Sequence, residues 1–220
     1  MKGLVHIVDD DSEVRAATSF MLRHLGYETQ IYAGGLEFLQ QRKLDRGCIL
    51  LDLQMPEMNG FEVLAKLAER KVDLPVIILT GHGDVPAAVQ AMKRGAVDFL
   101  EQPYDTHRLT AAIERASALA ETSREARQAR MEAVAKLKAL TPRESQILQG
   151  LRAGMRNKVI ARWLALSPRT VETYRANMMM RIGVTEMSNA LRIADDGGLP
   201  AINLGKNLEM VEFDMSIPTA

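Results

Sequence analysis

Ile49-Leu-Leu-Asp52-Leu-Gln-Met-Pro56-Glu-Met-Asn-Gly60 places a single carboxylate, that of Asp52, at the end of a short apolar run. The run from Cys48 to Leu51 is typical of a fully buried parallel strand. Ligands of open α/β sheets bind outside the carboxyl ends of such strands, so we expect Asp52 at the mouth of a sheet as the reactive residue. The alternative is a simple helix N-cap, the commoner role of a lone Asp before a helical pattern.

Strand and helix patterns alternate on both sides of this stretch. Further strands are expected at residues 4–8, 28–32, 75–79 and 97–100, and helices at 14–25, 35–41, 61–70, 85–94 and from 106 onward. Because right-handed β-α-β crossovers place helices on both faces of a parallel sheet, the alternation predicts an α/β, doubly wound, five-stranded parallel sheet.

Three of the expected strand ends carry polar groups. Asp9 and Asp10 follow the first strand, Asp52 follows the third and Thr80 follows the fourth. In a doubly wound sheet these groups converge on one pocket, where three carboxylates repel each other unless a cation lies between them. We expect Mg²⁺, because it prefers oxygen ligands and keeps positions open for phosphate oxygens. The pocket therefore suits phosphoryl chemistry.

The motifs at these strand ends resemble a known domain. The receiver domain of two-component response regulators is matched, over about residues 1–120, by Asp9-Asp10, Asp52-Leu-Gln-Met-Pro56, Thr80-Gly-His-Gly and Phe99-Leu-Glu-Gln-Pro103. The resemblance implies the flavodoxin-like fold for this part of the chain.

The same resemblance assigns roles by position. Asp52 would accept a phosphoryl group from a sensor histidine kinase. Asp9-Asp10 would bind Mg²⁺ together with Asp52 and the backbone carbonyl of Gln54. Thr80 would hydrogen-bond the phosphoryl group, and Phe99 would be the switch aromatic that rotates inward behind it. The switch is then a local change of charge with a packing readout.

Gln102 departs from the family pattern. The family normally has Lys immediately before the Pro of the fifth loop, where the ammonium group pairs with phosphoryl oxygens. An amide still donates a hydrogen bond, but it lacks the charge that makes such contacts about twice as strong. Two interpretations remain open: a tolerated substitution in which Mg²⁺ supplies enough charge, or an impaired or unconventional activation.

Composition and charge divide the chain. Its 220 residues with 47% hydrophobic content favour two domains. Residues 1–123 hold 13 Lys+Arg and 18 Asp+Glu, a net of −5, whereas residues 124–198 hold 14 and 7, a net of +7. The asymmetry suggests nucleic-acid contact by the second part, although solvated helix faces can also produce it. No apolar run approaches the roughly 18 residues of a membrane span, so we expect a cytoplasmic protein without membrane contact.

A helical linker is expected at residues 121–139. From Thr106 to Leu140 the sequence is rich in Ala, Arg and Glu and contains no Gly or Pro. We interpret this stretch as the last receiver helix extended toward a second domain, where it helps two chains to pair. A flexible, solvated connector is the alternative.

Residues 140–196 carry the pattern of an all-α, four-helix, helix-turn-helix domain. Thr141 and Glu144 form a capping box around Pro142, so a helix begins there. Asn157 is expected to cap a second helix, and Ser167-Pro168 to start a third that runs to Gly183. A fourth is expected at residues 188–194. Two helices about three residues apart make a helix-turn-helix.

This part resembles the LuxR-type DNA-binding domain. The resemblance covers about residues 137–196 and rests on Leu140-Thr-Pro-Arg-Glu144, Asn157-Lys-Val-Ile-Ala161 and Leu166-Ser-Pro-Arg-Thr-Val-Glu-Thr-Tyr-Arg175. With the receiver pattern in front, the whole chain looks like a FixJ/NarL-type response regulator. It is most similar to the FixJ group through Gly81-His82-Gly83-Asp84-Val85-Pro86.

In this family the third helix enters the major groove of DNA. Arg175 is expected to face guanine and Glu172 cytosine, with Thr173 beside them. Tyr174 stands where many relatives carry His and joins the expected DNA-binding set. The phosphate contacts expected by position are Lys158, Arg169, Thr170, Asn177 and Arg181.

We therefore predict a response regulator transcription factor, not an enzyme. Phosphorylation of Asp52 would promote homodimer formation and binding to double-stranded promoter DNA, with RNA polymerase as a further partner. One alternative, motivated by Gln102, is a DNA-binding regulator that works without phosphorylation. Another is a phosphate sink or adaptor that keeps the helix-turn-helix fold without binding an operator. A C-terminal tail at residues 197–220 matches nothing in the family and either docks on a partner or frays.

Overall fold

The computed structural model describes residues 2–41, 44–81, 85–200 and 202. The chain divides into two compact units, Met1–Arg124 and Glu125–Ala220. The expected tail beyond residue 202 and His82 of the fourth strand's loop lie outside the described residues.

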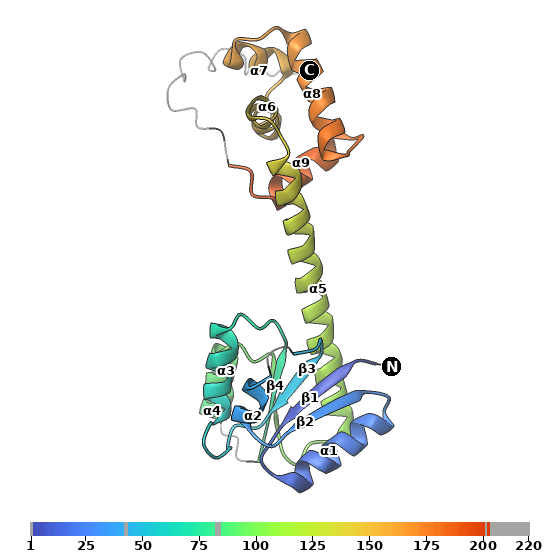
Figure 1. Cartoon of the computed structure of the whole chain (residues 1–220), viewed down its shortest axis with the longest axis vertical. Coiled ribbons are helices and arrows are strands. Elements are labelled where there is room, and N and C mark those ends of the chain that lie inside the picture. Colours follow the sequence, from blue (N-terminus) through green and yellow to red (C-terminus); the bar gives the residue numbers. More distant parts are fainter. Residues whose placement is uncertain (1, 42–43, 82–84, 201, 203–220) are drawn as a thin grey trace, which may run out of the picture. The chain divides into compact units, whose positions relative to one another are not determined.

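The first unit is built on a five-stranded parallel sheet (Figure 1). Its strands are β1 (Leu4–Val8), β2 (Glu28–Tyr32), β3 (Cys48–Leu51), β4 (Val76–Thr80) and β5 (Asp98–Glu101). They lie in the order β2-β1-β3-β4-β5. This is the order of a doubly wound flavodoxin-like sheet, so the predicted fold class of this unit is confirmed.

Helices cover both faces of the sheet. They are α1 (Ser12–His24), α2 (Gly35–Leu39), α3 (Gly60–Glu69), α4 (Val85–Lys93) and the first part of α5 (Thr106–Lys138). One apolar cluster joins α2, α3 and α4 to one face, and a second joins α1 and α5 to the other. Every residue of β3 and β4 is buried between the two clusters, as expected for central parallel strands.

The start of α3 separates the two interpretations of Asp52. Asn59 is the N-cap: its side chain accepts the N–H of Glu62, and Glu62 returns a hydrogen bond to the N–H of Asn59. This capping box satisfies the first turn of the helix. Asp52 therefore does not cap α3, which leaves its carboxylate to other partners.

In the part of the second unit that the structure describes, four helices follow the end of α5. They are α6 (Pro142–Arg152), α7 (Asn157–Leu164), α8 (Pro168–Ile182) and α9 (Met187–Asp196), as Figure 1 shows. One apolar cluster joins α6, α8 and α9, and a second joins α6, α7 and α8. The predicted all-α helix-turn-helix domain is confirmed, with Thr141 and Ser167 as side-chain caps of α6 and α8.

The predicted cap of α7 is wrong. Arg156, with extended backbone angles, is the N-cap, and it makes no side-chain cap hydrogen bond. Asn157 is the first helical residue, and its side-chain oxygen accepts a hydrogen bond from Arg175 instead. The sequence preference of Asn for N-cap positions misled the prediction because a tertiary partner competes for the same oxygen.

The long helix α5 has two packed ends and an exposed middle. Leu109, Ile113 and Ala116 are buried against the sheet of the first unit. All residues from 121 to 132 are exposed, whereas Ala133 is buried and Leu137 packs in the second unit. No helix among the described residues combines the length and the apolar character needed to cross a membrane.

Candidate functional site

The polar residues of the first unit gather because neighbouring strands end in register. Val8 of β1 pairs with Leu51 of β3, and the N–H of Asp52 donates to the carbonyl of Val8 at 2.9 Å. Asp9 and Asp52 therefore leave adjacent strands at the same edge of the sheet. Thr80 ends β4, the strand on the other side of β3.

Asp52 is half-buried and held by its own loop. Its Oδ2 accepts the backbone N–H of Gln54 at 3.1 Å, and Thr80 also forms a side-chain hydrogen bond to its carboxylate. Burial raises the pKa of Asp52 above its ordinary value of 3.8, although hydrogen bonds from Leu53, Gln54 and Thr80 partly offset this. A charged group that is costly to bury and flanked by a hydroxyl is typical of a reactive site.

Asp9 is the more deeply buried carboxylate, with 6% of its surface exposed. Its Oδ1 accepts the N–H of Asp11 at 2.8 Å, which favours the charged form. Burial nevertheless raises the pKa of Asp9 to about 6, and the charges of Asp52, Asp10 and Asp11 add to the rise. The negative charges of these carboxylates thus repel each other, and a bound cation would offset that repulsion.

The donor set fits a hard cation that keeps part of its water shell. Asp10 is exposed at the rim, and Asp9 and Asp52 lie deeper. Among the described residues, no group of three or more His, Cys, Asp or Glu side chains is gathered so as to hold an ion by itself. A backbone carbonyl, such as that of Gln54, and water would have to complete the shell, which is usual for Mg²⁺.

The loop after Asp52 is shaped by a close approach of two backbones. Gly60 donates its N–H to the carbonyl of Leu53 at 3.0 Å. A Cβ atom on Gly60 would lie 2.9 Å from the Cα of Leu53 and would also overlap the carbonyl oxygen of Asp52. The first residue of α3 therefore packs directly against the phosphoacceptor candidate's own peptide.

The remaining predicted residues of this site lie at the ends of β4 and β5. Thr80 is fully buried, and its carbonyl accepts the N–H of Gln102 at 2.8 Å. The peptide bond between Gln102 and Pro103 is cis. Phe99, paired in register with Ile78, is half-buried and packs against the cluster that holds α2, α3 and α4.

Two further contacts at this edge were not predicted from the sequence. Arg15 of α1 donates from Nη1 to the carbonyl of Asp9 at 2.6 Å. The hydroxyl of Tyr104, in the loop after β5, lies 2.9 Å from that of Thr18. Helical spacing indicates the face of α1 on which Arg15 and Thr18 lie, but no local pattern indicates their partners 6 and 86 residues away.

In the second unit, α8 presents one continuous exposed face. Val171, Met178 and Ile182 are buried in the core of this unit. Six exposed residues recur at helical spacing along this face: Arg169, Glu172, Thr173, Ala176, Asn177 and Met180. Pro168 at the start of the helix and Arg181 near its end are exposed as well. Ala176 and Met180, which is 78% exposed, were not among the predicted contacts because neither carries a polar group.

The predicted DNA-binding residues divide into two groups. By exposure, Lys158, Arg169, Glu172, Thr173, Asn177 and Arg181 are exposed, and Thr170, Tyr174 and Arg175 are half-buried.

Two of these residues, both arginines, also make contacts inside the domain. Arg175 Nη1 donates to Asn157 Oδ1 at 2.8 Å. Arg181 Nε lies 3.1 Å from Glu144 Oε2. The guanidinium groups of Arg175 and Arg181 are therefore engaged by α7 and α6, respectively.

Comparison with protein families agrees with both halves. The response regulator receiver domain matches residues 5–114, and the luxR family of bacterial regulatory proteins matches residues 138–194. Receiver domains typically bind Mg²⁺ at the phosphorylation site.

Known proteins match the chain over nearly its whole length. The transcriptional regulatory protein FixJ of Bradyrhizobium diazoefficiens is 40% identical over 199 residues, which are 90% of this chain and 97% of that protein. The solved structure of the response regulator StyR covers 89% of this chain and 99% of its own, with 35% identity and a TM-score of 0.77. The crystal structure of full-length FixJ from B. japonicum covers 91% of this chain and 99% of its own, with 40% identity and a TM-score of 0.58. The chain therefore belongs to the FixJ-type response regulators, transcription factors that join a receiver domain to a LuxR-type DNA-binding domain.

Proposed function

We propose that Asp52 accepts a phosphoryl group from a sensor histidine kinase and that this modification promotes pairing of two chains and binding to promoter DNA. The observation that carries the proposal is the arrangement at the end of β3. Asp52 is half-buried and hydrogen-bonded to Thr80. Burial raises the pKa of the neighbouring Asp9, and the charge of Asp52 adds to that rise. This is the environment of a carboxylate prepared for a reaction rather than of a solvated loop residue.

The transfer itself needs little covalent chemistry from the protein. A carboxylate oxygen of Asp52 attacks the phosphorus of a phosphohistidine, a P–O bond forms, and the P–N bond to the kinase histidine breaks. The hydroxyl of Thr80 then has a phosphoryl oxygen within reach in place of the carboxylate it bonds now. Movement of Thr80 toward that oxygen leaves room behind it, into which Phe99 rotates.

Asp9, Asp10, Asp52 and the carbonyl of Gln54 are the groups that would hold Mg²⁺. Bound there, the ion would offset the carboxylate repulsion and the charge of the phosphoryl oxygens. Gln102 lies beside this edge, since its N–H bonds to Thr80 and its Oε1 lies 3.9 Å from where a Cβ of Gly81 would be. Its amide can donate one neutral hydrogen bond to a phosphoryl oxygen.

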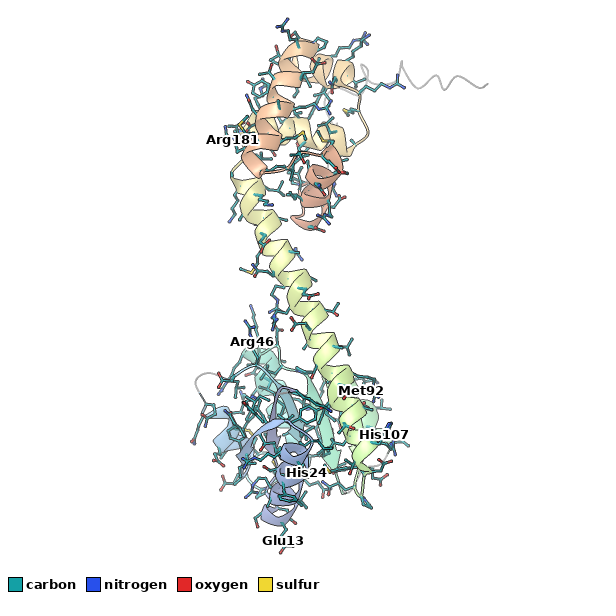
Figure 2. The ribbon with its side chains drawn as sticks, turned by 90° about the vertical axis from the view of Figure 1, so that its right-hand side faces the viewer. Glu13, His24, Arg46, Met92, His107 and Arg181 are labelled. Carbon is teal, nitrogen blue, oxygen red and sulfur yellow. The ribbon has the colours of Figure 1, made fainter. Side chains whose placement is uncertain are left out.

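Pairing of two chains is supported by an exposed apolar stripe on α4. The stripe consists of Val85, which is 78% exposed, and of Val89 and Met92, which are each 48% exposed. These residues follow one another at helical spacing, and Met92 is labelled in Figure 2. Such a stripe on the element next to Phe99 is a natural response surface, because apolar patches of this kind are normally covered in a complex. DNA would be read by the exposed face of α8, with Lys158 and Arg169 near phosphates and RNA polymerase as a later partner.

The decisive experiment measures phosphoryl incorporation from a small phosphodonor with Mg²⁺ and follows oligomeric state in the same samples. We expect label in the wild-type chain, none in Asp52→Asn, and a dimer only in labelled samples. Label without a dimer would separate the chemistry from the pairing step. Absence of label would favour a regulator that works without phosphorylation.

A matched variant tests the effect of Gln102, which stands where the family normally has Lys. Gln102→Lys restores the ammonium group that the family normally carries, so we expect a higher rate of incorporation with the same dependence on Asp52. An unchanged rate would mean that the substitution is tolerated and that the remaining groups supply enough charge.

A further inference from the structure

Two arginines on the flanks of α8 tie this helix to the helices behind it. Arg175 bonds to Asn157, the first residue of α7, and Arg181 pairs with Glu144 in the first turn of α6. Arg181, labelled in Figure 2, lies near the C-terminal end of α8. The helix is therefore held at two points of its length by side chains of its own.

The carboxylate of Glu144, which accepts from Arg181, is buried and has further hydrogen-bond donors. Glu144 is only 2% exposed, and its Oε2 also accepts the N–H and the hydroxyl of Thr141, both at 2.8 Å. Burial raises the pKa of Glu144, but the bonds from Thr141 and Arg181 outweigh this and hold the pKa below its ordinary value. The carboxylate is thus charged at neutral pH, and leaving it without its cation would be costly. That cost favours the contact of Arg181 with Glu144, although the side chain of Arg181 is 47% exposed.

The geometry of α8 places these arginines to either side of the centre of the exposed face, although the side chain of Arg181 is itself 47% exposed. At 3.6 residues per turn, Arg169, Thr173, Ala176 and Met180 lie along the centre of that face. On the same count Arg175 and Arg181 fall on opposite flanks, each more than a quarter turn from the centre. They are placed to brace the helix from both sides.

We propose that Arg175 and Arg181 are positioning residues, which set the angle at which α8 presents its exposed face and do not themselves contact bases or phosphates. The inference rests on the proposed DNA binding. It replaces the guanine contact expected of Arg175 and the phosphate contact expected of Arg181.

Salt dependence distinguishes the two roles. Each phosphate that a protein neutralises contributes about 0.9 to the slope of log affinity against log salt. The full-length chain is titrated between about 50 and 200 mM salt with a short duplex selected by the wild-type chain from a random-sequence pool, and with an unselected duplex of the same length. The exposed Arg169 supplies the matched control.

We expect Arg169→Gln to lower the slope by about 0.9 per bound chain and to weaken both duplexes alike. Arg181→Gln should leave the slope unchanged and reduce the preference for the selected duplex severalfold, because the bases and the helix no longer align. Arg175→Gln and Asn157→Ala should behave in the same way. Glu144→Gln should reproduce the loss, and the double variant with Arg181→Gln should be no worse than either single change.

A slope loss in Arg181→Gln equal to that in Arg169→Gln would overturn the inference. So would tighter binding by Glu144→Gln, since a freed guanidinium that touched phosphate would gain from losing its carboxylate partner. Fluorescence of Trp163, the single tryptophan, confirms that each variant is folded. If the wild-type chain prefers no duplex over another, both the proposed function and this inference are wrong. If the wild-type chain has a preference but the Arg175 and Arg181 variants lose salt-dependence slope, only the inference is wrong.

Discussion

Gly60 shows how one missing side chain shapes the reactive loop. Because a Cβ there would overlap the carbonyl of Asp52 and approach the Cα of Leu53, Gly60→Ala must push the loop away. We expect a loss of about 1–3 kcal/mol of stability and slower phosphoryl incorporation at Asp52. Differential scanning calorimetry and the labelling assay measure the two effects.

Gly34→Ala is the matched control for this prediction. Gly34 has extended backbone angles and open space where a Cβ atom would lie, so Ala fits there without overlap. Equal losses in the two variants would show that the close approach at Gly60 is not what matters.

We expect Asp9 to make the affinity for Mg²⁺ depend on pH in an unusual range. Its pKa is raised to about 6 because it is buried among like charges, so a proton competes with the metal ion well above the ordinary 3.8. The carboxylate is free to bind above about pH 6, and affinity is lost as the pH falls through that value. Calorimetric titration with Mg²⁺ across this range measures it; a constant affinity down to about pH 4 would contradict the assignment.

The convergence of the polar residues at one edge of the sheet could be predicted because strand ends are visible in the sequence. Asp9, Asp52 and Thr80 each follow an apolar run, and parallel strands bring such ends together. The contact of Arg15 with the carbonyl of Asp9 could not be predicted, since it depends on the path of a loop. The distinction between buried Asp9 and exposed Asp10 likewise depends on the turn into α1 rather than on residue type.

At the scale of elements, Ser167 is the clearest determinant of where α8 begins. Its side-chain oxygen accepts the N–H of Thr170 at 3.1 Å. Ser167→Ala leaves that N–H without its cap, and we expect a loss of about 1 kcal/mol. Trp163 packs in the cluster of α6, α7 and α8, so its fluorescence during urea unfolding reports the stability of this domain.

The opposite change is available at α7. Arg156 stands at the N-cap with φ −74° and ψ 155°, angles that Ser adopts readily, but it provides no side-chain cap. Arg156→Ser should therefore stabilise the domain by about 0.5–1 kcal/mol. Trp163 fluorescence during urea unfolding measures this gain. No gain, or a loss, would show that the first turn of α7 is already satisfied by other groups.

The elements with strong local signals were predicted to within a few residues. The capping box of α6 and the apolar runs of β3 and β4 are such signals, because both depend on residues that are close together in the sequence. The start of α7 was misassigned because Asn157 has the residue type of a cap but bonds to Arg175 of another helix. The exposed face of α8 was only partly predicted, since Ala176 and Met180 carry no charge to mark them.

At the scale of the whole molecule, the two halves of the chain differ in net charge. The first 123 residues carry a net of −5, and residues 124–198 carry +7. A basic domain gains affinity for DNA from phosphate neutralisation, whereas acidic residues in the receiver domain would be needed to hold the proposed Mg²⁺. Composition alone predicted this division, but it contains no information about which arginines of the basic half face outward.

Pairing of two chains predicts a dependence on the spacing of DNA half-sites. A symmetric dimer places its two recognition helices about one helical turn apart, or 10–10.5 base pairs centre to centre. Phosphorylation should therefore raise the affinity for a duplex with two correctly spaced half-sites far more than for a single half-site. Inserting about half a turn, roughly 5 base pairs, should abolish that gain, because the second helix then meets the wrong face of the duplex.

Asp52→Asn is the control in the spacing experiment. It should bind the correctly spaced and the shifted duplex with equal affinity, since it gains no phosphoryl group to favour pairing. If the phosphorylated wild-type chain tolerates the half-turn insertion without loss, the two DNA-binding domains act independently and phosphorylation must raise affinity within a single chain. If spacing matters equally in Asp52→Asn, pairing occurs on DNA without phosphorylation, and the receiver controls a different step.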